Sequence, residues 1–214
     1  PDSPSSTFLV YELIKEAGVE INPEMAVNLL AGLVTDTGGF QFVELDSSLL
    51  QVVADLISSG ASLAEIMRYA FRFRRLEALK LLGRALNHLF YDEDYRFSVI
   101  HLTQEDFKIC GAQEEDTEGI VDYGLYIPGA EISLLFKEVN NNYFRVSLRS
   151  QGEKDVLPIA HHFGGGGHRK AAGFGIKGDL SHVEEEVLGI VRKFLANSRL
   201  VTEETRKNSD GWNT

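Results

Sequence analysis

The hydrophobic pattern of the chain changes its period at residues 91–94, and this change restricts the fold more than any other feature. From residue 8 to about residue 90, apolar side chains recur every three or four positions, the spacing of helices. Tyr91-Asp92-Glu93-Asp94 breaks that spacing, and runs rich in β-branched and aromatic residues then alternate with helical stretches. The sequence therefore predicts an α/β protein with an all-helical first part and a compact α/β second part.

The first part carries the start and stop signals of successive helices. Asn22 followed by Pro23 is typical of a helix start, and the polar turn at 35–40 with its two glycines ends that helix. Asp46 is the expected N-cap of a third helix, and Ser62 with Glu65 forms a capping-box pattern for a fourth. We expect these helices, and one at 8–17, to pack on one another.

Residues 68–84 form the only strongly basic stretch of an otherwise acidic chain. Glu77 is the one acidic residue among the cations Arg68, Arg72, Arg74, Arg75, Lys80 and Arg84. Helical spacing continues to about Phe90, so we predict a long connecting helix. Its basic side could be a cationic patch or a solvated face, and the sequence leaves both open.

Strand signals dominate the second part. A β-rich run lies at 97–102, and the runs 132–139 and 143–148 are separated by Asn140-Asn141-Asn142, which predicts a hairpin. Helices are expected to open at Thr103 and at Thr117, to cover 155–163, and to close the fold with an amphipathic segment at 183–195. Residues 201–214 are predicted to be a disordered tail.

Charge and apolar content restrict the functional classes. The 214 residues include 21 Lys+Arg and 32 Asp+Glu, a formal net charge of −11, which argues against binding to nucleic acid or membranes mainly through bulk charge. We find no apolar run of the length that a membrane span needs and no signal-peptide pattern at residues 1–6. A cytoplasmic protein with no membrane partner is expected, in which the single Cys110 is a small buried apolar residue.

The strongest local signal is the glycine run that ends in Gly167-His168-Arg169-Lys170. Successive glycines leave a backbone free to bend around a ligand, and the imidazole and guanidinium add donors that suit an anion. A flexible linker rarely sits between an apolar helix and a packing patch such as Ala171-Ala172-Gly173, and the Gly-Lys-Ser/Thr of a nucleotide P-loop is missing. We therefore predict a phosphate-binding segment.

Further candidates lie outside this run. Asp36 ends a buried helix beside two glycines, where a metal or a phosphate could approach, but taken alone such a residue is more often one that bonds its own turn. Arg149 ends a strand and could hold a phosphate through two parallel hydrogen bonds, or be a solvated arginine. His161 and His162 look like a metal pair, yet adjacent helical positions face different directions, which favours a structural pair.

These motifs together resemble the DHH-family phosphoesterases, in particular bacterial oligoribonucleases that also dephosphorylate 3′-phosphoadenosine 5′-phosphate. The resemblance rests on 36–40, 147–150 and 164–173 and covers residues 1 to about 200. It implies a larger domain that holds two Mn²⁺ ions, and a smaller α/β domain that grips the substrate across a cleft. It also implies that Asp36 is a metal ligand, and it assigns no catalytic residue. The substrate-binding residues that it implies are Arg149, Gly164, Gly165, Gly166, Gly167, His168 and Arg169.

The resemblance also predicts a division of the chain. Residues 1–75 would be the C-terminal part of the DHH phosphoesterase domain, 76–94 a connecting helix and linker, and 95–200 the DHH-associated substrate-binding domain. The Asp-His-His motif and the N-terminal aspartate motifs of the family are absent. We therefore expect the sequence to lack a preceding segment of the family and most of its metal ligands, and this chain alone to be inactive.

For the intact protein, the resemblance implies metal-dependent hydrolysis of short oligonucleotides, 3′-phosphoadenosine 5′-phosphate, or both. The expected partner is a nucleotide or short single-stranded oligonucleotide, and a homodimer stays open. Two other interpretations also stay open: a non-catalytic nucleotide-binding module and a fragment of a cyclic-dinucleotide phosphodiesterase. A nucleic-acid editing role, suggested by the glycine-rich domain that ends alanyl-tRNA synthetases, is opposed by the motif around Asp36.

Overall fold

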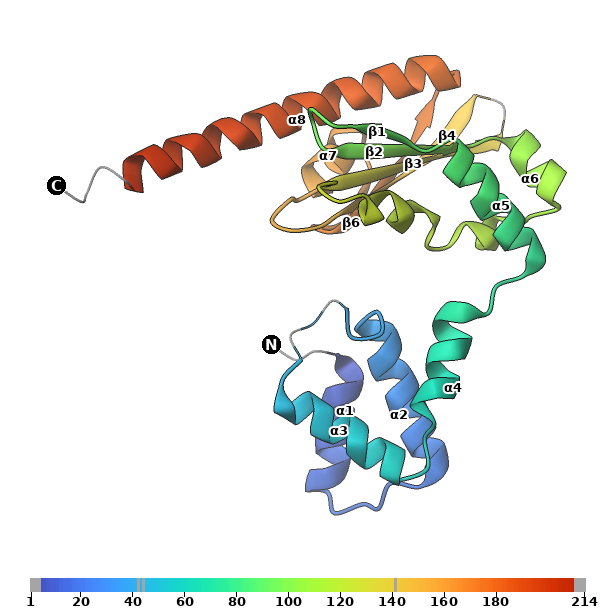
Figure 1. The fold of residues 1–214 in the computed structure, drawn as a ribbon, viewed down its shortest axis with the longest axis vertical. Helices are drawn as coiled ribbons and strands as arrows, with labels where there is room; N and C mark the ends of the chain where they lie inside the picture. The colour runs from blue at the N-terminus through green and yellow to red at the C-terminus, as the bar shows by residue number, and fades with distance from the viewer. Residues whose placement is uncertain (1–4, 42, 44, 141, 210–214) are drawn as a thin grey trace. The chain divides into compact units, whose positions relative to one another are not determined.

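The computed structural model describes residues 5–41, 43, 45–140 and 142–209, without the side chains of 197–209 (Figure 1). The chain divides into two compact units, Pro1–Arg74 and Arg75–Thr214. Each unit has its own apolar core. The first is helical and the second is α/β, as the change of period predicts.

The first unit contains α1 (Ser6–Glu16), α2 (Pro23–Asp36), α3 (Ser47–Ser58), α4 (Leu63–Met67) and the π-helical turn η1 (Arg68–Arg72). The predicted caps are confirmed, because the side chains of Asn22, Asp46 and Ser62 each accept a hydrogen bond from the backbone N–H three residues later. Its core is built from Tyr11, Ala26, Leu29, Leu30, Leu33, Val34, Leu49, Val52, Val53, Leu56 and Ala61.

The basic stretch is not one continuous helix. After η1, the backbone is extended at Phe73 (ψ 117°) and Arg75 (ψ 151°), and α5 (Leu76–Asn87) begins afterwards. The break separates residues that pack in different cores, since Ala70 lies against the first core and Leu81 is buried in a core of the second unit. Residues 76–94, predicted to be a connecting helix and linker, contain α5 and the strand β1 (Phe90–Asp92) and belong to the second unit.

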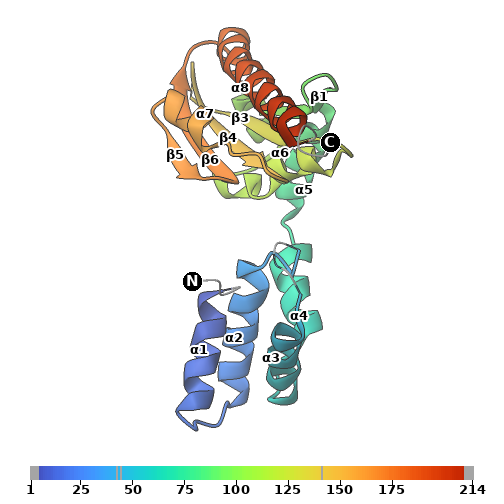
Figure 2. The same ribbon diagram turned by 90° about the vertical axis from the view of Figure 1, so that its left-hand side faces the viewer.

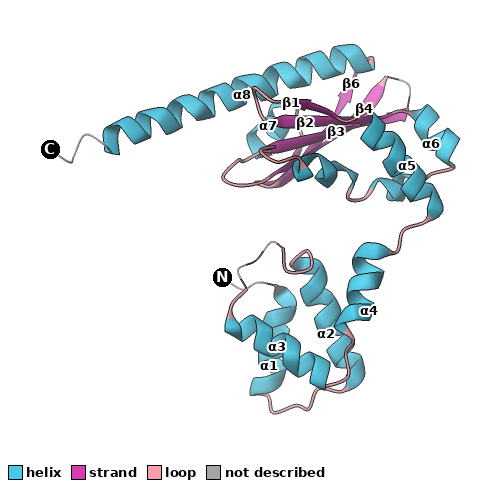
Figure 3. Ribbon diagram, in the orientation of Figure 1, coloured by secondary structure: helices cyan, strands magenta, loops and turns pink. Residues whose placement is uncertain are grey.

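Within the described residues, the strands of the second unit form one six-stranded sheet in the order β1-β2-β3-β4-β6-β5 (Figure 3). Its remaining strands are β2 (Phe97–Leu102), β3 (Ile132–Asn140), β4 (Tyr143–Ser150), β5 (Gly166–His168) and β6 (Ala171–Lys177). The pair β2 and β3 is parallel, and the other neighbours are antiparallel. The predicted hairpin joins β3 to β4, with Asn142 left-handed at φ 61°, and Asn141 lies outside the described residues.

The two faces of the sheet are covered unequally. One face packs under α7 (Leu157–His162) and α8 (Leu180–Ser209), which lies along the sheet in Figure 1. On the opposite face, α5, α6 (Gln104–Cys110) and the 3₁₀ helix η3 (Ile120–Tyr126) bury Ile100, Leu102 and Leu135 of β2 and β3. Cys110 is buried in that layer, as predicted. These helices do not cover the β5 and β6 end of that opposite face, where β5 is exposed and Ala171 and Gly173 of β6 are partly exposed.

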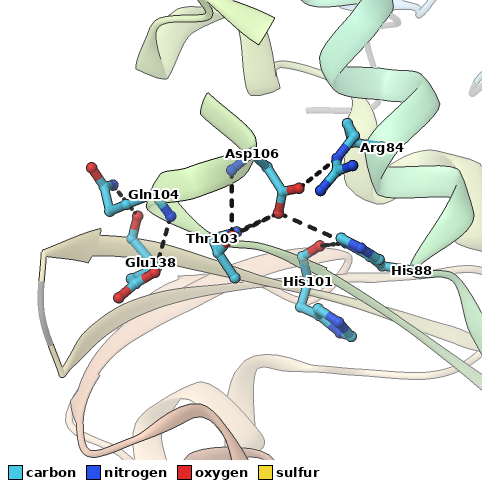
Figure 4. A network of polar contacts seen from close by, with 7 residues as sticks. All are labelled: Arg84, His88, His101, Thr103, Gln104, Asp106 and Glu138. Carbon is cyan, nitrogen blue, oxygen red and sulfur yellow. Dashed lines mark hydrogen bonds and ion pairs between the residues drawn. The ribbon is translucent and has the colours of Figure 1, made fainter. Parts of the chain in front are cut away.

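A polar network joins α5, β2 and α6 (Figure 4). Arg84 Nε donates to Asp106 Oδ1 at 2.7 Å, and Asp106 Oδ2 accepts from the backbone and hydroxyl of Thr103, both at 2.9 Å. Thr103 therefore caps α6, as predicted. His88 Nδ1 lies 3.1 Å from the carbonyl oxygen of His101, and the two rings stack with centroids 4.7 Å apart. The network holds α5 against the sheet.

Two predicted elements are wrong. Thr117 does not open a helix but ends the 3₁₀ helix η2 (Glu114–Thr117), because left-handed Gly119 (φ 78°) redirects the chain before η3. The predicted disordered tail is helical from 201 to 209, since α8 continues to Ser209. No glycine or proline interrupts the sequence there before Gly211. Residues 210–214 lie outside the described residues.

Of the described helices, none is by itself long and apolar enough to cross a membrane. The bent pair Ser47–Ser58 and Leu63–Arg72, at 106°, reaches that length and composition only when the two helices are taken together.

Candidate functional site

The glycine run forms an ordered edge hairpin. Gly166–His168 is strand β5, which pairs antiparallel with β6 at the edge of the sheet, and Arg169 and Lys170 make the turn between them (Figure 2). Lys170 Nζ closes the turn by donating to the carbonyl oxygens of Gly152 and Lys154. The expectation of a pliant bend is therefore wrong, because β6 supplies a strand partner that the sequence pattern does not reveal.

The glycines of the run serve two different purposes. A side chain on Gly165 would overlap the carbonyl oxygen of Gly173, and one on Gly167 (φ 139°) would lie 2.5 Å from that of Ala171. These two glycines are required by packing and backbone conformation. In contrast, a Cβ on Gly164 (φ 73°) or Gly166 would meet nothing within 4 Å. Since Gly166 is not left-handed either, its missing side chain leaves space that the fold does not use.

The sheet register brings distant candidates together. His168 pairs with Ala171, and Ala171 pairs with Arg149, so the three residues form one row across β5, β6 and β4. Paired residues of antiparallel strands point to the same face, and two strand spacings place His168 and Arg149 about 10 Å apart. A neighbouring row consists of Gly166, Gly173 and Ser147. The imidazole of His168 and the guanidinium of Arg149 thus lie beside a floor of small residues.

This face lies opposite the one that α7 and α8 cover. On β4, Val146 and Leu148 point toward those helices and are buried, whereas Arg149 is partly exposed on the other side. We call the surface made by Ser147, Arg149, Gly166, His168, Ala171 and Gly173 the glycine face. Its exposed position allows an anion to approach the row of His168 and Arg149 directly.

Asp122 places a carboxylate beside Arg149 of the glycine face. Its Oδ1 lies 3.5 Å from Arg149 Nε, and the two side chains are 42% and 37% exposed. Burial raises the pKa of Asp122, and the positive charge of Arg149 opposes that rise. The ion pair is long, so an incoming anion can compete with this carboxylate for the guanidinium.

The other predicted ligands of the run behave differently. The ring of His168 is exposed, and none of the described residues forms a hydrogen bond with it. Arg169 Nε lies 3.3 Å from Asp155 Oδ2, beside the start of α7. The structure therefore brings His168 and Arg149 together but pairs Arg169 with Asp155. His161 and His162 are exposed at the end of α7, and His162 packs edge-on against Phe163, so the two residues are an exposed pair on a helix end.

Asp36, in the first unit, is exposed at the end of α2. Its Oδ2 accepts a long hydrogen bond of 3.5 Å from the hydroxyl of Thr7. The following turn is held by the buried Thr37, whose hydroxyl donates to the Leu33 carbonyl at 2.7 Å and accepts from Phe40 N at 3.1 Å. Thr37 thus fills the turn-bonding role that was open for Asp36, and the carboxylate is left at the surface.

The donor set around Asp36 does not amount to a metal centre. Across the described parts of the chain, no three His, Cys, Asp or Glu side chains lie where they could share a metal ion. Divalent ions such as Mn²⁺ need several oxygen or imidazole ligands that converge from different segments. The residues described here therefore do not fit the complete two-ion site that the resemblance implies.

Sequence reasoning did not assign three contributors to the site, although two of them lie within the motifs that it singled out. Asp122 lies on η3, 27 positions before Arg149 in the sequence, and no local motif marks it. Ser147 and Gly173 gain their place in the floor only through the register of β4 with β6. The four consecutive glycines were the usable signal, but they did not distinguish Gly166 from the glycines that packing requires.

Comparisons with known proteins identify relatives of this chain. Residues 107–197 match the DHHA1 domain. A bifunctional oligoribonuclease and PAP phosphatase NrnA from Thermus thermophilus is 33% identical over 199 residues, which are 92% of this chain and 59% of that protein. The protein of the same name from Bacillus subtilis is 28% identical over 175 residues, 80% of this chain and 55% of its own length.

A solved structure supports the fold. The crystal structure of an exopolyphosphatase-related protein from Bacteroides fragilis superposes with a TM-score of 0.84 at 29% identity, over 92% of this chain and 59% of that one. The present chain thus spans between half and two thirds of the length of these relatives. These similarities support the resemblance inferred from the motifs: residues 107–197 match the DHHA1 domain, and most of the chain is similar to bifunctional oligoribonuclease and PAP phosphatase NrnA proteins.

Proposed function

We propose that the glycine face binds a phosphate group of a nucleotide or short single-stranded oligonucleotide. The observation that carries the proposal is the row of His168, Ala171 and Arg149 beside Gly166, where the fold leaves unused space. The named activities of the relatives, oligoribonuclease and PAP phosphatase, supply the substrate class. In the whole protein, this face would serve the hydrolysis of short oligonucleotides, 3′-phosphoadenosine 5′-phosphate, or both.

The residues of the glycine face suit binding and positioning. The guanidinium of Arg149 can donate two parallel hydrogen bonds to phosphate oxygens, and His168 can donate a third from the opposite side of Ala171. As an edge strand, β5 also offers backbone N–H groups on its outer side. The missing side chain of Gly166 lets a phosphate approach the backbone closely. These groups orient a phosphate ester and neutralise part of its charge.

The role of metal ions in the whole protein is a separate proposal, because the described residues offer only part of a metal site. Asp36 could supply one carboxylate ligand to a Mn²⁺ ion, which would polarise a phosphoryl group when bound. Since the described residues include no group of three ligands, we derive no catalytic step from them. The 214-residue chain is therefore expected to bind nucleotides and to lack appreciable phosphatase activity. The same observation favours, as second candidate, a nucleotide-binding module without catalysis.

Gly166→Val tests the proposal. The new side chain fits the fold, because the position is open and valine favours strands, but it fills the space assigned to the phosphate. We expect the affinity for 3′-phosphoadenosine 5′-phosphate, measured by isothermal titration calorimetry, to fall about 5- to 100-fold, the cost of overfilling a contact. The melting temperature should stay within a few degrees of the wild type.

Gly189→Ala is the matched control, because a Cβ on Gly189 would also meet nothing within 4 Å, yet this glycine lies on α8, the helix that covers the other face. Its affinity should equal that of the wild type. Unchanged affinity in Gly166→Val would show that the ligand does not approach the glycine face. Activity of the unmodified chain near ordinary enzyme rates, roughly one turnover per second, would instead refute the expected lack of catalysis.

A further inference from the structure

The segment Arg68–Arg74 of the first unit alternates cations with aromatic rings at the surface. Tyr69 is 71% exposed and Phe73 is 54% exposed. Among the described residues, no acidic side chain pairs with Arg68, Arg72 or Arg74. Three arginines without acidic partners are a local exception in a chain with a net charge of −11. Together with the exposed rings of Tyr69 and Phe73, these arginines give the segment the composition of a ligand surface.

The local backbone presents the rings to solvent. Residues Arg68–Arg72 form a π-helical turn, which is closed by a 3.0 Å hydrogen bond from Phe73 N to the Arg68 carbonyl. Such turns are rare and occur frequently at functional sites. Tyr69 and Phe73 meet edge to face, with centroids 5.1 Å apart and planes at 81°. An edge-to-face contact covers at most one face of one ring, so flat apolar surface stays available on both.

The same segment packs on the turn that follows Asp36. A Cβ on Gly39 would lie 3.1 Å from both Met67 Cε and Phe71 Cε2, so these side chains lie directly against the turn. Gly39 needs its left-handed conformation, φ 67°, to make the turn. Within the first unit, the basic segment therefore lies next to the turn that follows Asp36, the exposed last residue of α2.

We propose that Arg68–Arg74 docks single-stranded nucleic acid, with bases stacked on Tyr69 and Phe73 and phosphates contacted by Arg68, Arg72 and Arg74. Aromatic rings interleaved with cations are the usual means of binding a single strand without sequence preference. An acidic protein would pair with the guanidinium groups but would not need exposed ring faces. A duplex keeps its bases stacked inside, so it could use only the arginines.

The proposal rests on the proposed function and adds to it a separate contact surface for the single-stranded oligonucleotides named there. Its test is the anisotropy of a short fluorescein-labelled single-stranded RNA bound to the full chain. The double variant Tyr69→Ala/Phe73→Ala, here called the ring variant, should bind this RNA more weakly, by about fivefold or more for each ring removed. Arg72→Gln should lower the slope of log affinity against log salt by about 0.7.

Matched controls are available in the second unit. Phe90 on β1 is 54% exposed, the same as Phe73, and Lys108 on α6 is an exposed cation. Phe90→Ala and Lys108→Gln should leave both the affinity and the salt slope unchanged. All substituted residues are exposed, and thermal melts of each variant establish that it is folded.

A second ligand separates this proposal from the function it rests on. Binding of 3′-phosphoadenosine 5′-phosphate should be unchanged in the ring variant but weakened in Gly166→Val. If Gly166→Val leaves the binding of 3′-phosphoadenosine 5′-phosphate intact while the ring variant binds RNA more weakly, phosphate binding at the glycine face is refuted and docking at Arg68–Arg74 is supported. Wild-type RNA affinity in the ring variant would overturn the docking proposal. Equal ring-dependent losses for duplex RNA or for poly-glutamate would also overturn it.

Discussion

Replacing Asp122 by asparagine should strengthen the binding of phosphate ligands. In the free protein its carboxylate lies 3.5 Å from Arg149 Nε and competes with any anion for that guanidinium. Asparagine keeps the shape of the side chain but removes the negative charge. The fold should tolerate the change, because burial raises the pKa of Asp122 and the folded state therefore disfavours the charged form.

The magnitude follows from Coulomb's law. A phosphate bound to the far side of the guanidinium would lie about 7 Å from the carboxylate, a repulsion of about 0.6 kcal/mol in water and about 2.4 kcal/mol at an effective dielectric constant of 20. Since both side chains are about two fifths exposed, solvent screening favours the lower end. We expect the affinity to rise roughly three- to fivefold, which is about 0.6 to 1 kcal/mol.

The assay is calorimetric titration with a phosphodiester dinucleotide of uridine, because uracil does not protonate in the acidic range and the ligand charge therefore stays constant. The gain from Asp122→Asn should be full at neutral pH and should vanish as the pH falls through the raised pKa of Asp122, because the wild-type carboxyl is then neutral as well. Glu131→Gln is the control, since Glu131 pairs with Arg96 and Lys154 instead of with Arg149. Weaker binding in Asp122→Asn would refute this reasoning and would make Asp122 a residue that orients Arg149 for the ligand.

Two further predictions concern stability. Gly167→Ala should destabilise the fold by about 1–3 kcal/mol in urea unfolding, because φ is 139° and the new methyl meets the Ala171 carbonyl; an unchanged midpoint would contradict the close packing of the edge hairpin. Burial works against ionisation of Asp106, but hydrogen bonds from Thr103 and Arg84 hold its pKa below the usual value. The ionised carboxylate therefore stabilises the fold at pH values above the pKa of Asp106 in the unfolded chain, and this stabilisation is lost as the pH falls through the lower pKa of the folded state. Asp106→Asn should reduce the free energy of unfolding most at neutral pH and least in acid. Urea unfolding at several pH values measures this difference.

The local features of the fold could be predicted from the sequence. Asn22, Asp46 and Thr103 cap helices where their positions predicted, because a cap depends on neighbours only three residues away. The hairpin at Asn140–Asn142 is a similar case. The break before α5 could not be predicted, since helical spacing continues across it and only the two separate cores reveal it.

The sequence indicated candidate phosphate-binding residues, but it did not indicate which of them share a surface. The glycine run indicated anion binding, yet the pairing of His168 with Arg149 through Ala171 depends on a strand order that brings β6 between β4 and β5. Thr37, and not Asp36, holds the turn after α2, a distinction that depends on which of two adjacent side chains is buried. Sequence spacing contains neither of these facts.

Amide chemical shifts during titration with 3′-phosphoadenosine 5′-phosphate test the location of phosphate binding most directly. We predict that the largest changes fall on Gly166, His168, Ala171 and Arg149, and that in Gly166→Val the changes at the other three residues need about 5- to 100-fold more ligand. Changes centred on α7 and α8, which cover the other face of the sheet, would contradict phosphate binding at the glycine face.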